Sequence, residues 1–126
     1  MRILIFEDTA AKYGDVSKAI RQGGFAHVEI ERATNLEDGI RRVREQNEKQ
    51  EPYNLIITDM WYPKCQGAAD EESGDALIQL SHAENWNIPV ILCSNIRYRY
   101  ADILGVVHYS ATGDWESKLI ALIRQI

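Results

Sequence analysis

The chain has 126 residues, with 14 Lys and Arg against 19 Asp and Glu, and carries a formal net charge of -5 at pH 7. This length suits one domain with its own hydrophobic core, and we expect a single domain over residues 1–126. The acidic balance argues against nucleic acid and anionic membranes as partners. Since the first apolar run is short and soon interrupted by acids, we expect neither a signal peptide nor a membrane-spanning segment, and therefore a cytoplasmic protein.

The first part of the chain predicts strands and helices in alternation. RILIF at 2–6 is too short for a helix and predicts a strand buried on both faces. Helical spacing of apolar residues follows over 10–22, before a pair of glycines of the kind that commonly ends a helix. HVEIERA at 27–33 alternates like a half-buried edge strand. Thr34 then stands three residues before Glu37, a capping-box spacing that predicts the start of the next helix.

The middle of the chain repeats this alternation. LIIT at 55–58 predicts a third strand, 75–82 a helix with its apolar residues inward, and IPVILCS at 88–94 a fourth strand. Cys65 falls in a predicted loop and Cys93 in a predicted buried strand. These contexts suit reduced thiols better than a disulfide or a metal cluster, so we assign neither cysteine a redox role.

The last part of the chain predicts one more strand and a closing helix. NIRYRYADIL at 95–104 leaves room for about two helical turns, so a helix there must be short. GVVHY at 105–109 predicts the fifth strand. A final helix begins near Thr112 or Asp114 and carries an apolar stripe that we interpret as core.

Strands that alternate with helices imply right-handed crossovers and a mainly parallel sheet. Such a sheet buries both of its faces, so helices must cover it on each side. The sequence therefore predicts an α/β three-layer sandwich. In open sheets of this kind the ligand site lies beyond the carboxyl ends of the strands, and polar residues at those ends carry the functional signal.

Polar side chains follow three of the predicted strands. Glu7 and Asp8 follow the first strand, Asp59 follows the third, and Ser94 ends the fourth. A single carboxylate beyond a strand is commonly a helix cap, and Asp8 taken alone is open to that explanation. Three carboxylates crowded together destabilise a fold unless a cation or a proton intervenes. Oxygen ligands completed by water favour Mg²⁺, and no Cys/His grouping offers a zinc site.

Two further stretches complete a recognisable pattern. DMWYPKCQG, which starts at Asp59, contains Pro63 and Gly67, and IPVILCSN contains Ser94. Together with the strand that ends in Glu7-Asp8, they make nearly the whole chain resemble an atypical receiver domain of two-component response regulators, similar to the chemotaxis regulators. The resemblance implies a flavodoxin-like receiver fold, with a five-stranded parallel sheet in the order 2-1-3-4-5 and, here, a shortened fourth helix.

The resemblance implies a role for each residue at the strand ends. Asp59 would be the phosphoacceptor, Ser94 would hydrogen-bond the phosphoryl group, and Mg²⁺ would be held by Glu7, Asp8, Asp59 and the backbone carbonyl of Trp61. The phosphoryl group would come from a histidine kinase or a phosphotransfer protein. A downstream protein target would bind the phosphorylated domain. The chain could also form a homodimer. A carboxylate can attack phosphorus when metal and donors neutralise the phosphoryl oxygens, so the residue types agree.

One residue that the family normally carries is missing. Family members have a Lys at the end of the fifth strand, followed by Pro, and its ammonium pairs with the phosphoryl group. Tyr109 or His108 holds that place here, Ser110 follows, and Lys118 falls inside the last helix. Losing this charge should weaken the phosphorylated state by roughly a few kcal/mol at most. A protonated His108 could substitute, although a His at a strand end is more often structural.

Further departures concern access to the site and the signalling face. Asn95 stands where family members have a small residue, and Val106 or Val107 where they have an aromatic switch residue. AADEES at 68–73 adds acids near the site, most simply as an exposed loop. IRYRY at 96–100 interleaves Arg and Tyr, which suits a protein-docking surface or simply a short amphipathic helix.

Three functions compete. The first is a stand-alone receiver in phosphorelay signalling, phosphorylated on Asp59. The second is a pseudo-receiver that works without phosphorylation as an adaptor or dimerisation module, which the missing Lys favours. The third is a Mg²⁺-dependent phosphatase or nuclease. It ranks last because Trp61 stands where such an enzyme needs a second acid and no general base is evident, so we do not expect an enzyme.

Overall fold

The structure is a computed structural model and describes residues 1–25 and 27–126. In chain order its helices and strands are β1 (Arg2–Phe6), α1 (Ala10–Gln22), β2 (Glu29–Ala33), α2 (Leu36–Glu48), β3 (Leu55–Thr58), β4 (Tyr62–Pro63), β5 (Asp70–Glu71), α3 (Ser73–Ala83), β6 (Val90–Ser94), β7 (Gly105–His108) and α4 (Trp115–Ile123). One five-stranded parallel sheet has the order β2-β1-β3-β6-β7. Because β6 and β7 are the fourth and fifth predicted strands, the predicted order 2-1-3-4-5 is confirmed.

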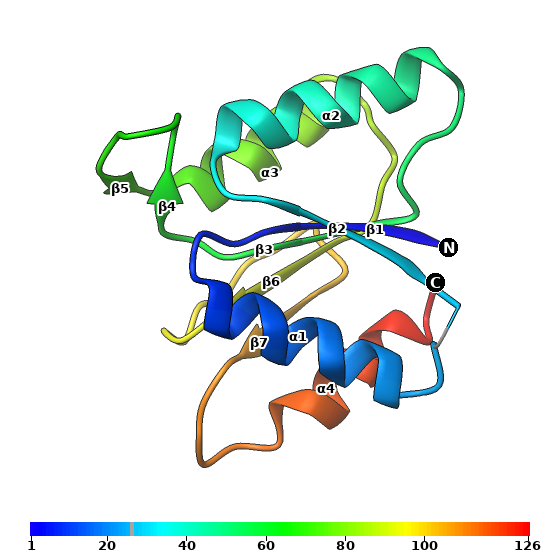
Figure 1. Ribbon diagram of the computed structural model, residues 1–126, viewed down its shortest axis with the longest axis vertical. Helices are drawn as coiled ribbons and strands as arrows, with labels where there is room; N and C mark the ends of the chain where they lie inside the picture. Colours follow the sequence, from blue (N-terminus) through cyan, green and yellow to red (C-terminus); the bar gives the residue numbers. More distant parts are fainter. Residues whose placement is uncertain (26) are drawn as a thin grey trace.

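The sheet is covered on both faces, as a three-layer sandwich requires. Figure 1 shows α2 and α3 on one side of the sheet and α1 and α4 on the other. Successive residues of β1 point to opposite faces. Ile3 and Ile5 pack in the core cluster on the α1 and α4 side. Leu4 and Phe6 pack in the cluster on the α2 and α3 side. The apolar runs are thus buried on both faces, which explains why they lack polar alternation.

The register of the central strands brings their carboxyl ends to the same level. Phe6 of β1 is aligned with Thr58 of β3. Beyond that pair, the N–H of Asp59 donates to the carbonyl of Phe6 at 3.1 Å. On the other side, the N–H of Glu7 donates to the carbonyl of Ala33 at 2.9 Å. The residues that follow β1 and β3 are therefore held beside each other by main-chain hydrogen bonds.

Helix α2 begins one residue later than the capping-box spacing predicted. Its N-cap is Asn35, not Thr34, and the Asn35 side-chain oxygen accepts the N–H of Asp38 at 2.9 Å. Asn is at least as good an N-cap as Thr. This start also buries Leu36, the first residue of the helix. The prediction of a Thr34–Glu37 capping box was therefore wrong, although the helix itself was predicted correctly.

The shortened fourth helix is not formed, and among the described residues the segment 95–104 contains no helix. This segment must return along the full length of the sheet, a distance of about 15 Å for a five-residue strand. Ten helical residues would span only about 15 Å and leave nothing for the turns at either end. The chain instead crosses in an irregular path, with Asp102 at a φ of 62° and the N–H of Leu104 bonded to the carbonyl of Val90 at 2.9 Å. The expectation of a short helix there was wrong.

The acidic loop after β3 is partly ordered as a ribbon that the sequence did not predict. β4 and β5 pair antiparallel, with Tyr62 opposite Glu71 and Pro63 opposite Asp70. Gly67, at the turn between them, has a φ of 83°, which a side chain would strain. The acids of β5 are exposed, as predicted for this stretch. The ribbon therefore fixes the position of an acidic edge next to the carboxyl ends of the sheet.

The remaining expectations differ from the structure only in detail. β2 begins at Glu29 and not at 27, α3 starts two residues earlier than predicted, and α4 ends at Ile123. Cys65 and Cys93 are both free cysteines, as predicted. No helix among residues 1–25 and 27–126 is both long and apolar enough to span a bilayer.

Candidate functional site

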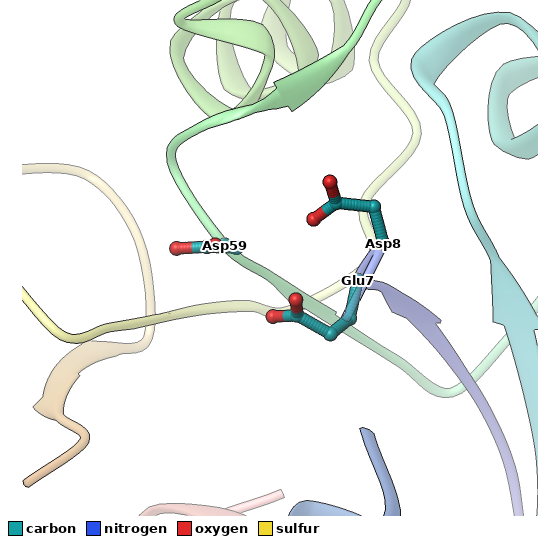
Figure 2. Close-up of side chains that lie close together, drawn as sticks. All are labelled: Glu7, Asp8 and Asp59. Carbon is teal, nitrogen blue, oxygen red and sulfur yellow. The ribbon is translucent and has the colours of Figure 1, made fainter. Parts of the chain in front are cut away.

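Three carboxylates meet at the carboxyl edge of the sheet. Glu7 and Asp8 follow β1, Asp59 follows β3, and each offers an oxygen that lies within 4.8 Å of the other two. Figure 2 shows the three side chains together at the ends of these neighbouring strands. Glu7 is buried and the other two are half-buried. The structure therefore brings together the three carboxylates that the sequence singled out.

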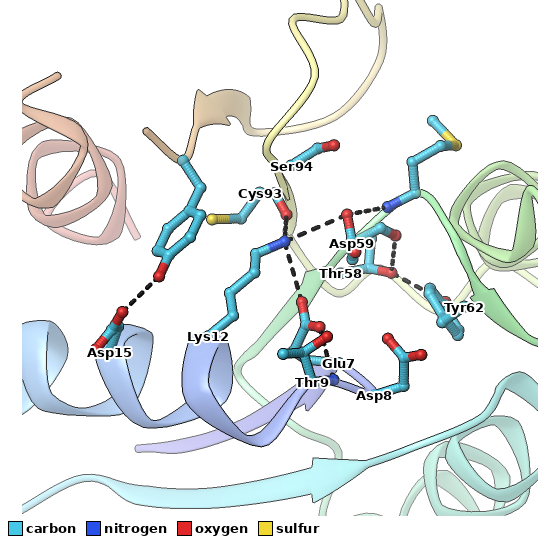
Figure 3. Close-up of polar contacts among 12 residues, drawn as sticks. Glu7, Asp8, Thr9, Lys12, Asp15, Thr58, Asp59, Tyr62, Cys93 and Ser94 are labelled. Carbon is cyan, nitrogen blue, oxygen red and sulfur yellow. Dashed lines mark hydrogen bonds and ion pairs between the residues drawn. The ribbon is translucent and has the colours of Figure 1, made fainter. Parts of the chain in front are cut away.

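A lysine that the sequence analysis missed lies inside this cluster. Lys12, in the first turn of α1, places its Nζ 2.7 Å from the carbonyl oxygen of Cys93. The same atom lies 3.0 Å from Oε1 of Glu7 and 3.3 Å from Oδ1 of Asp59. Figure 3 shows the side chain rising from α1 into the space between these groups. Only 10% of the Lys12 side chain is exposed, so the pocket contains its own cation.

The sequence did hold a signal for Lys12. The buried residues of α1 are Lys12, Val16, Ala19 and Ile20, which follow one helical stripe. Lysine is almost never buried unless it is paired with an opposite charge. A lysine at a core-facing position of the helix that follows two acids therefore indicates a buried ion pair. Which acids it would reach depended on how α1 packs on the sheet.

The charges in the pocket shift one another's protonation. Burial raises the pKa of Glu7, and the attraction of Lys12 offsets this only in part. Burial also raises the pKa of Asp8, and the charge of Asp70 in the ribbon adds to the effect. Burial alone would lower the pKa of Lys12, but Glu7 and Asp59 outweigh it, so the pKa is raised. Lys12 is therefore an ammonium at neutral pH.

The hydrogen bonds to Asp59 fall on one of its two oxygens. Oδ1 accepts the N–H of Met60 at 2.7 Å and lies 3.3 Å from Lys12 Nζ. Among the described contacts, none involves Oδ2. The side chain of Asp59 is 13% exposed, so it keeps a small accessible surface. One oxygen is thus held by the protein and the other is left for a ligand or for chemistry.

Ser94 ends β6 at the same edge of the pocket, as Figure 3 shows. Its side chain is fully buried, and its hydroxyl oxygen accepts the N–H of Ile96 at 3.2 Å. Its described contacts do not include the carboxylates. The hydroxyl is therefore positioned by its own loop, beside the acids and not bonded to them.

The structure at the end of β7 distinguishes between His108 and Tyr109 as the residue in the place of the family's lysine. The ring of His108 contacts the loop after β6, with Nε2 3.1 Å from the carbonyl oxygen of Asn95, and its described contacts do not include the three acids. The N–H of Tyr109 donates to the carbonyl of Ser94 at 2.8 Å. The ring of Tyr109 faces the pocket, with its centroid 5.5 Å from Lys12 Nζ. An aromatic ring therefore occupies the expected place of the ammonium, and His108 does not substitute for it.

Two loops beside the pocket are tied together by an exposed aromatic pair. Trp61, two residues after Asp59, is 40% exposed. Its indole N–H donates to the hydroxyl of Tyr98 at 2.7 Å. This bond joins the loop after β3 to the loop after β6, so the indole is placed to report on changes at Asp59.

The donor set of the pocket fits a hard divalent cation. All three side chains present carboxylate oxygens, which Mg²⁺ prefers. Lys12 contacts Glu7 and Asp59, and its described contacts do not include Asp8. The side of the cluster formed by Asp8 therefore keeps its negative charge, and the ammonium does not satisfy the cluster alone.

No protein-family model matches the sequence, and no curated protein matches it. Solved structures do match over almost the full length. A LuxR-family DNA-binding response regulator from Staphylococcus aureus has a TM-score of 0.71 at 19% identity, covering 98% of this chain and 96% of that one. The phosphorylated cyanobacterial phytochrome response regulator RcpA has a TM-score of 0.68 at 16% identity, covering 98% and 89%.

A third similar structure is larger than this chain. RcsB from Salmonella enterica serovar Typhimurium, bound to promoter rprA in the presence of phosphomimetic BeF3-, has a TM-score of 0.69 at 18% identity. The match covers 99% of this chain but only 62% of that one, so the chain spans less than two thirds of RcsB. At these identities the likeness establishes the fold. The chain has the receiver fold of response regulators, as the sequence resemblance predicted.

Proposed function

We propose that this chain is a phosphorelay receiver domain, spanning residues 1–126, that accepts a phosphoryl group on Asp59. The observation that carries the proposal is the position of Asp59. It stands at the carboxyl end of the central strand of a receiver fold, within 4.8 Å of two further acids, with one oxygen outside the protein's own hydrogen bonds. This is the arrangement that a carboxylate nucleophile needs when it attacks an anionic phosphoryl group.

Glu7, Asp8, Asp59 and the backbone carbonyl of Trp61 are the proposed ligands of Mg²⁺. When bound, Mg²⁺ supplies positive charge that neutralises the phosphoryl oxygens. Burial and the charge of Asp70 both raise the pKa of Asp8, because both disfavour its ionised form. A cation next to Asp8 would stabilise the ionised carboxylate and so offset both effects. The acidic edge of the ribbon thus favours a metal on that side of the pocket.

In the transfer step one bond to phosphorus forms and one bond to phosphorus breaks. The unheld oxygen of Asp59 forms a bond to phosphorus while the bond from phosphorus to nitrogen of a donor phosphohistidine breaks, and the imidazole takes that electron pair. The hydroxyl of Ser94, now bonded to the N–H of Ile96 at 3.2 Å, would turn to a phosphoryl oxygen. If this rotation carries Oγ away from the N–H of Ile96, the loop after β6 is released, and a charge on Asp59 then changes the surface that a protein target contacts.

The donor would be a histidine kinase or a phosphotransfer protein in the cytoplasm, and the readout a protein contact with a downstream target. The IRYRY segment is a candidate for that contact because it follows β6 directly, and its Tyr98 is bonded to the loop of Asp59 through Trp61. We propose no enzymatic activity beyond this transfer. A homodimer remains compatible with the proposal.

One observation favours a second function, a pseudo-receiver that acts as an adaptor or dimerisation module without phosphorylation. Lys12 already pairs with Glu7 and Asp59, so the pocket is partly neutralised by the protein itself. A fold that balances its own acids can persist without metal or phosphate.

Intact-mass spectrometry separates the two functions. The wild-type protein is incubated with Mg²⁺ and a small phosphodonor such as acetyl phosphate, and treated with hydroxylamine in a parallel sample. The proposal predicts the mass gain of one phosphoryl group that hydroxylamine removes and that Asp59→Asn abolishes. The control is Asp102→Asn, since Asp102 is exposed and Asn tolerates its φ of 62°. No mass gain in the wild type, with donor and Mg²⁺ in excess, would favour the pseudo-receiver.

A further inference from the structure

We propose that Lys12 supplies from helix α1 the positive charge toward the phosphoryl group that the end of the fifth strand lacks. The inference rests on the proposed phosphorylation of Asp59. Its basis is the position of Nζ, which lies between Glu7 and Asp59 inside the pocket. The ammonium thus reaches the phosphoacceptor from the helix below the sheet edge, as Figure 3 shows, and not from the end of β7.

The three contacts of the ammonium differ in a way that suits this role. An ammonium has three N–H donors. The contacts with the Cys93 carbonyl at 2.7 Å and with Glu7 at 3.0 Å are the shorter ones, and both acceptors are fixed in or next to buried strands. The contact with Asp59 at 3.3 Å is the longest. Two donors therefore hold Nζ in place, and the third can pass from the Asp59 carboxylate to an oxygen of a phosphoryl group bonded to it.

Tyr109 accounts for the absence of a second lysine. Its ring stands 5.5 Å from Lys12 Nζ, and its hydroxyl donates to Asp15 of the same helix. A lysine at position 109 would bring a second ammonium toward Nζ, and like charges at such distances repel. An aromatic face beside an ammonium is instead favourable. Lys12 and Tyr109 therefore fit together: the helix supplies the cation, and an aromatic ring stands at the end of β7, where family members have a lysine.

Lys12 and the metal ion would occupy different sides of the cluster. The described contacts of Nζ involve Glu7 and Asp59 and do not include Asp8, although an Asp8 oxygen lies within 4.8 Å of the other two carboxylates. The ammonium is accordingly an addition to Mg²⁺ and not a replacement for it. Loss of Lys12 should weaken phosphoryl transfer and leave metal binding intact.

The test compares Lys12→Met, which keeps length and apolar stem but removes the charge, with the wild type. Lys18→Met is the matched control, because Lys18 is an exposed residue of the same helix. The readouts are the phosphorylation rate with acetyl phosphate, the affinity for Mg²⁺ from tryptophan emission, and the binding of beryllofluoride with Mg²⁺. Circular dichroism and thermal melts establish that each variant is folded.

We expect Lys12→Met to phosphorylate at least about tenfold more slowly and to lose beryllofluoride affinity, because one charge-assisted donor to the phosphoryl group is gone. Its affinity for Mg²⁺ should be unchanged or higher, and Lys18→Met should match the wild type. The double variant Lys12→Met/Tyr109→Lys should recover part of the rate, because it returns an ammonium to the strand end. If Lys12→Met alone does not fold, the double variant compared with the wild type and Lys18→Met carries the test.

The outcomes distinguish this inference from the proposed function. A wild-type protein that is phosphorylated together with a Lys12→Met variant that is phosphorylated equally fast overturns the role of Lys12 alone. Phosphorylation of the wild type without Mg²⁺, lost in Lys12→Met, overturns the separate placement and makes the ammonium a metal substitute. A wild-type protein that neither gains the phosphoryl mass nor binds beryllofluoride overturns the proposed function and this inference together.

Discussion

Lys12 and Glu7 form an ion pair with 3.0 Å between Nζ and Oε1, and their side chains are only 10% and 3% exposed. Such a pair is not a source of great stability, because desolvation offsets much of the attraction. Removing one partner is a different matter, since it strands a buried charge. The pair therefore couples the start of α1 to the end of β1, at the point where the candidate site is built.

A double-mutant cycle should reveal this coupling. We expect Glu7→Gln to lower the free energy of unfolding by about 3 kcal/mol, the lower end for a broken buried pair, since Lys12 keeps its contacts with Asp59 and the Cys93 carbonyl. Lys12→Met should cost at least as much, because it leaves Glu7 and Asp59 close together without a cation. The double variant should lose about 1–3 kcal/mol less than the sum of the singles. Urea denaturation at pH 7 measures all four proteins. Strictly additive losses would show that the two side chains do not interact in solution.

The same variant makes a prediction about pH. Burial raises the folded-state pKa of Glu7, and Lys12 lowers it, so Lys12→Met should raise it further. A raised folded-state pKa means that protonation stabilises the fold below the unfolded pKa, and that this stabilisation is lost as the pH rises through the folded pKa. The stability deficit of Lys12→Met relative to the wild type should therefore be largest near neutral pH and shrink as the pH falls toward 4.5, the usual value for Glu. A deficit that grows on acidification would contradict this assignment.

Gly74 allows helix α3 to approach closely the backbone of Asp59, the proposed phosphoacceptor. A Cβ at this position would lie 2.3 Å from the carbonyl oxygen of Asp59 and 2.8 Å from Cα of Met60. Since backbone atoms cannot move aside as a flexible side chain can, Gly74→Ala should push α3 away from the strand end. We expect a loss of about 1–3 kcal/mol in the free energy of unfolding and slower phosphorylation of Asp59. Urea denaturation and the mass assay above measure both.

Gly14→Ala is the matched control for this substitution. A Cβ at Gly14 meets nothing within 4 Å, and the residue lies inside helix α1. Ala is favoured over Gly in a helix, so this variant should gain about 0.5–1 kcal/mol. If Gly14→Ala and Gly74→Ala shift stability in the same direction, the close approach at Asp59 is not what Gly74 provides.

Trp61 should report metal binding. We expect Mg²⁺ to change the tryptophan emission, and Trp61→Phe to remove most of the change. Trp86 is only 8% exposed in the core on the α2 and α3 side, and Trp115 is connected to the pocket only through the ring of Tyr109. Asp8→Asn should weaken the Mg²⁺ affinity by at least about tenfold, since it removes a proposed ligand. A response that survives Trp61→Phe undiminished would locate the cation away from the loop of Trp61 and Asp59.

Short stretches of the sequence were enough to predict most of the fold and the three carboxylates of the candidate site. The apolar runs at 2–6 and 55–58 predicted β1 and β3, and the alternation with helices predicted the parallel sheet and its two covered faces. The three carboxylates were found for the same reason. Residues that directly follow parallel strands lie at one edge of the sheet, and the pairing of β1 with β3 then brings these three close together.

What only the tertiary structure decided depends on how elements distant in sequence pack together. The path of 95–104 followed from the span that it must cross and not from its composition. The choice between His108 and Tyr109 depended on the register of β7 on β6, which aligns His108 with Ser94. Lys12 joined the acids because α1 packs with its first turn at the sheet edge, within reach of Glu7 and Asp59. Local periodicity sets which face of a helix is buried, but the groups that a long side chain then contacts are set by the angle and position at which that helix docks.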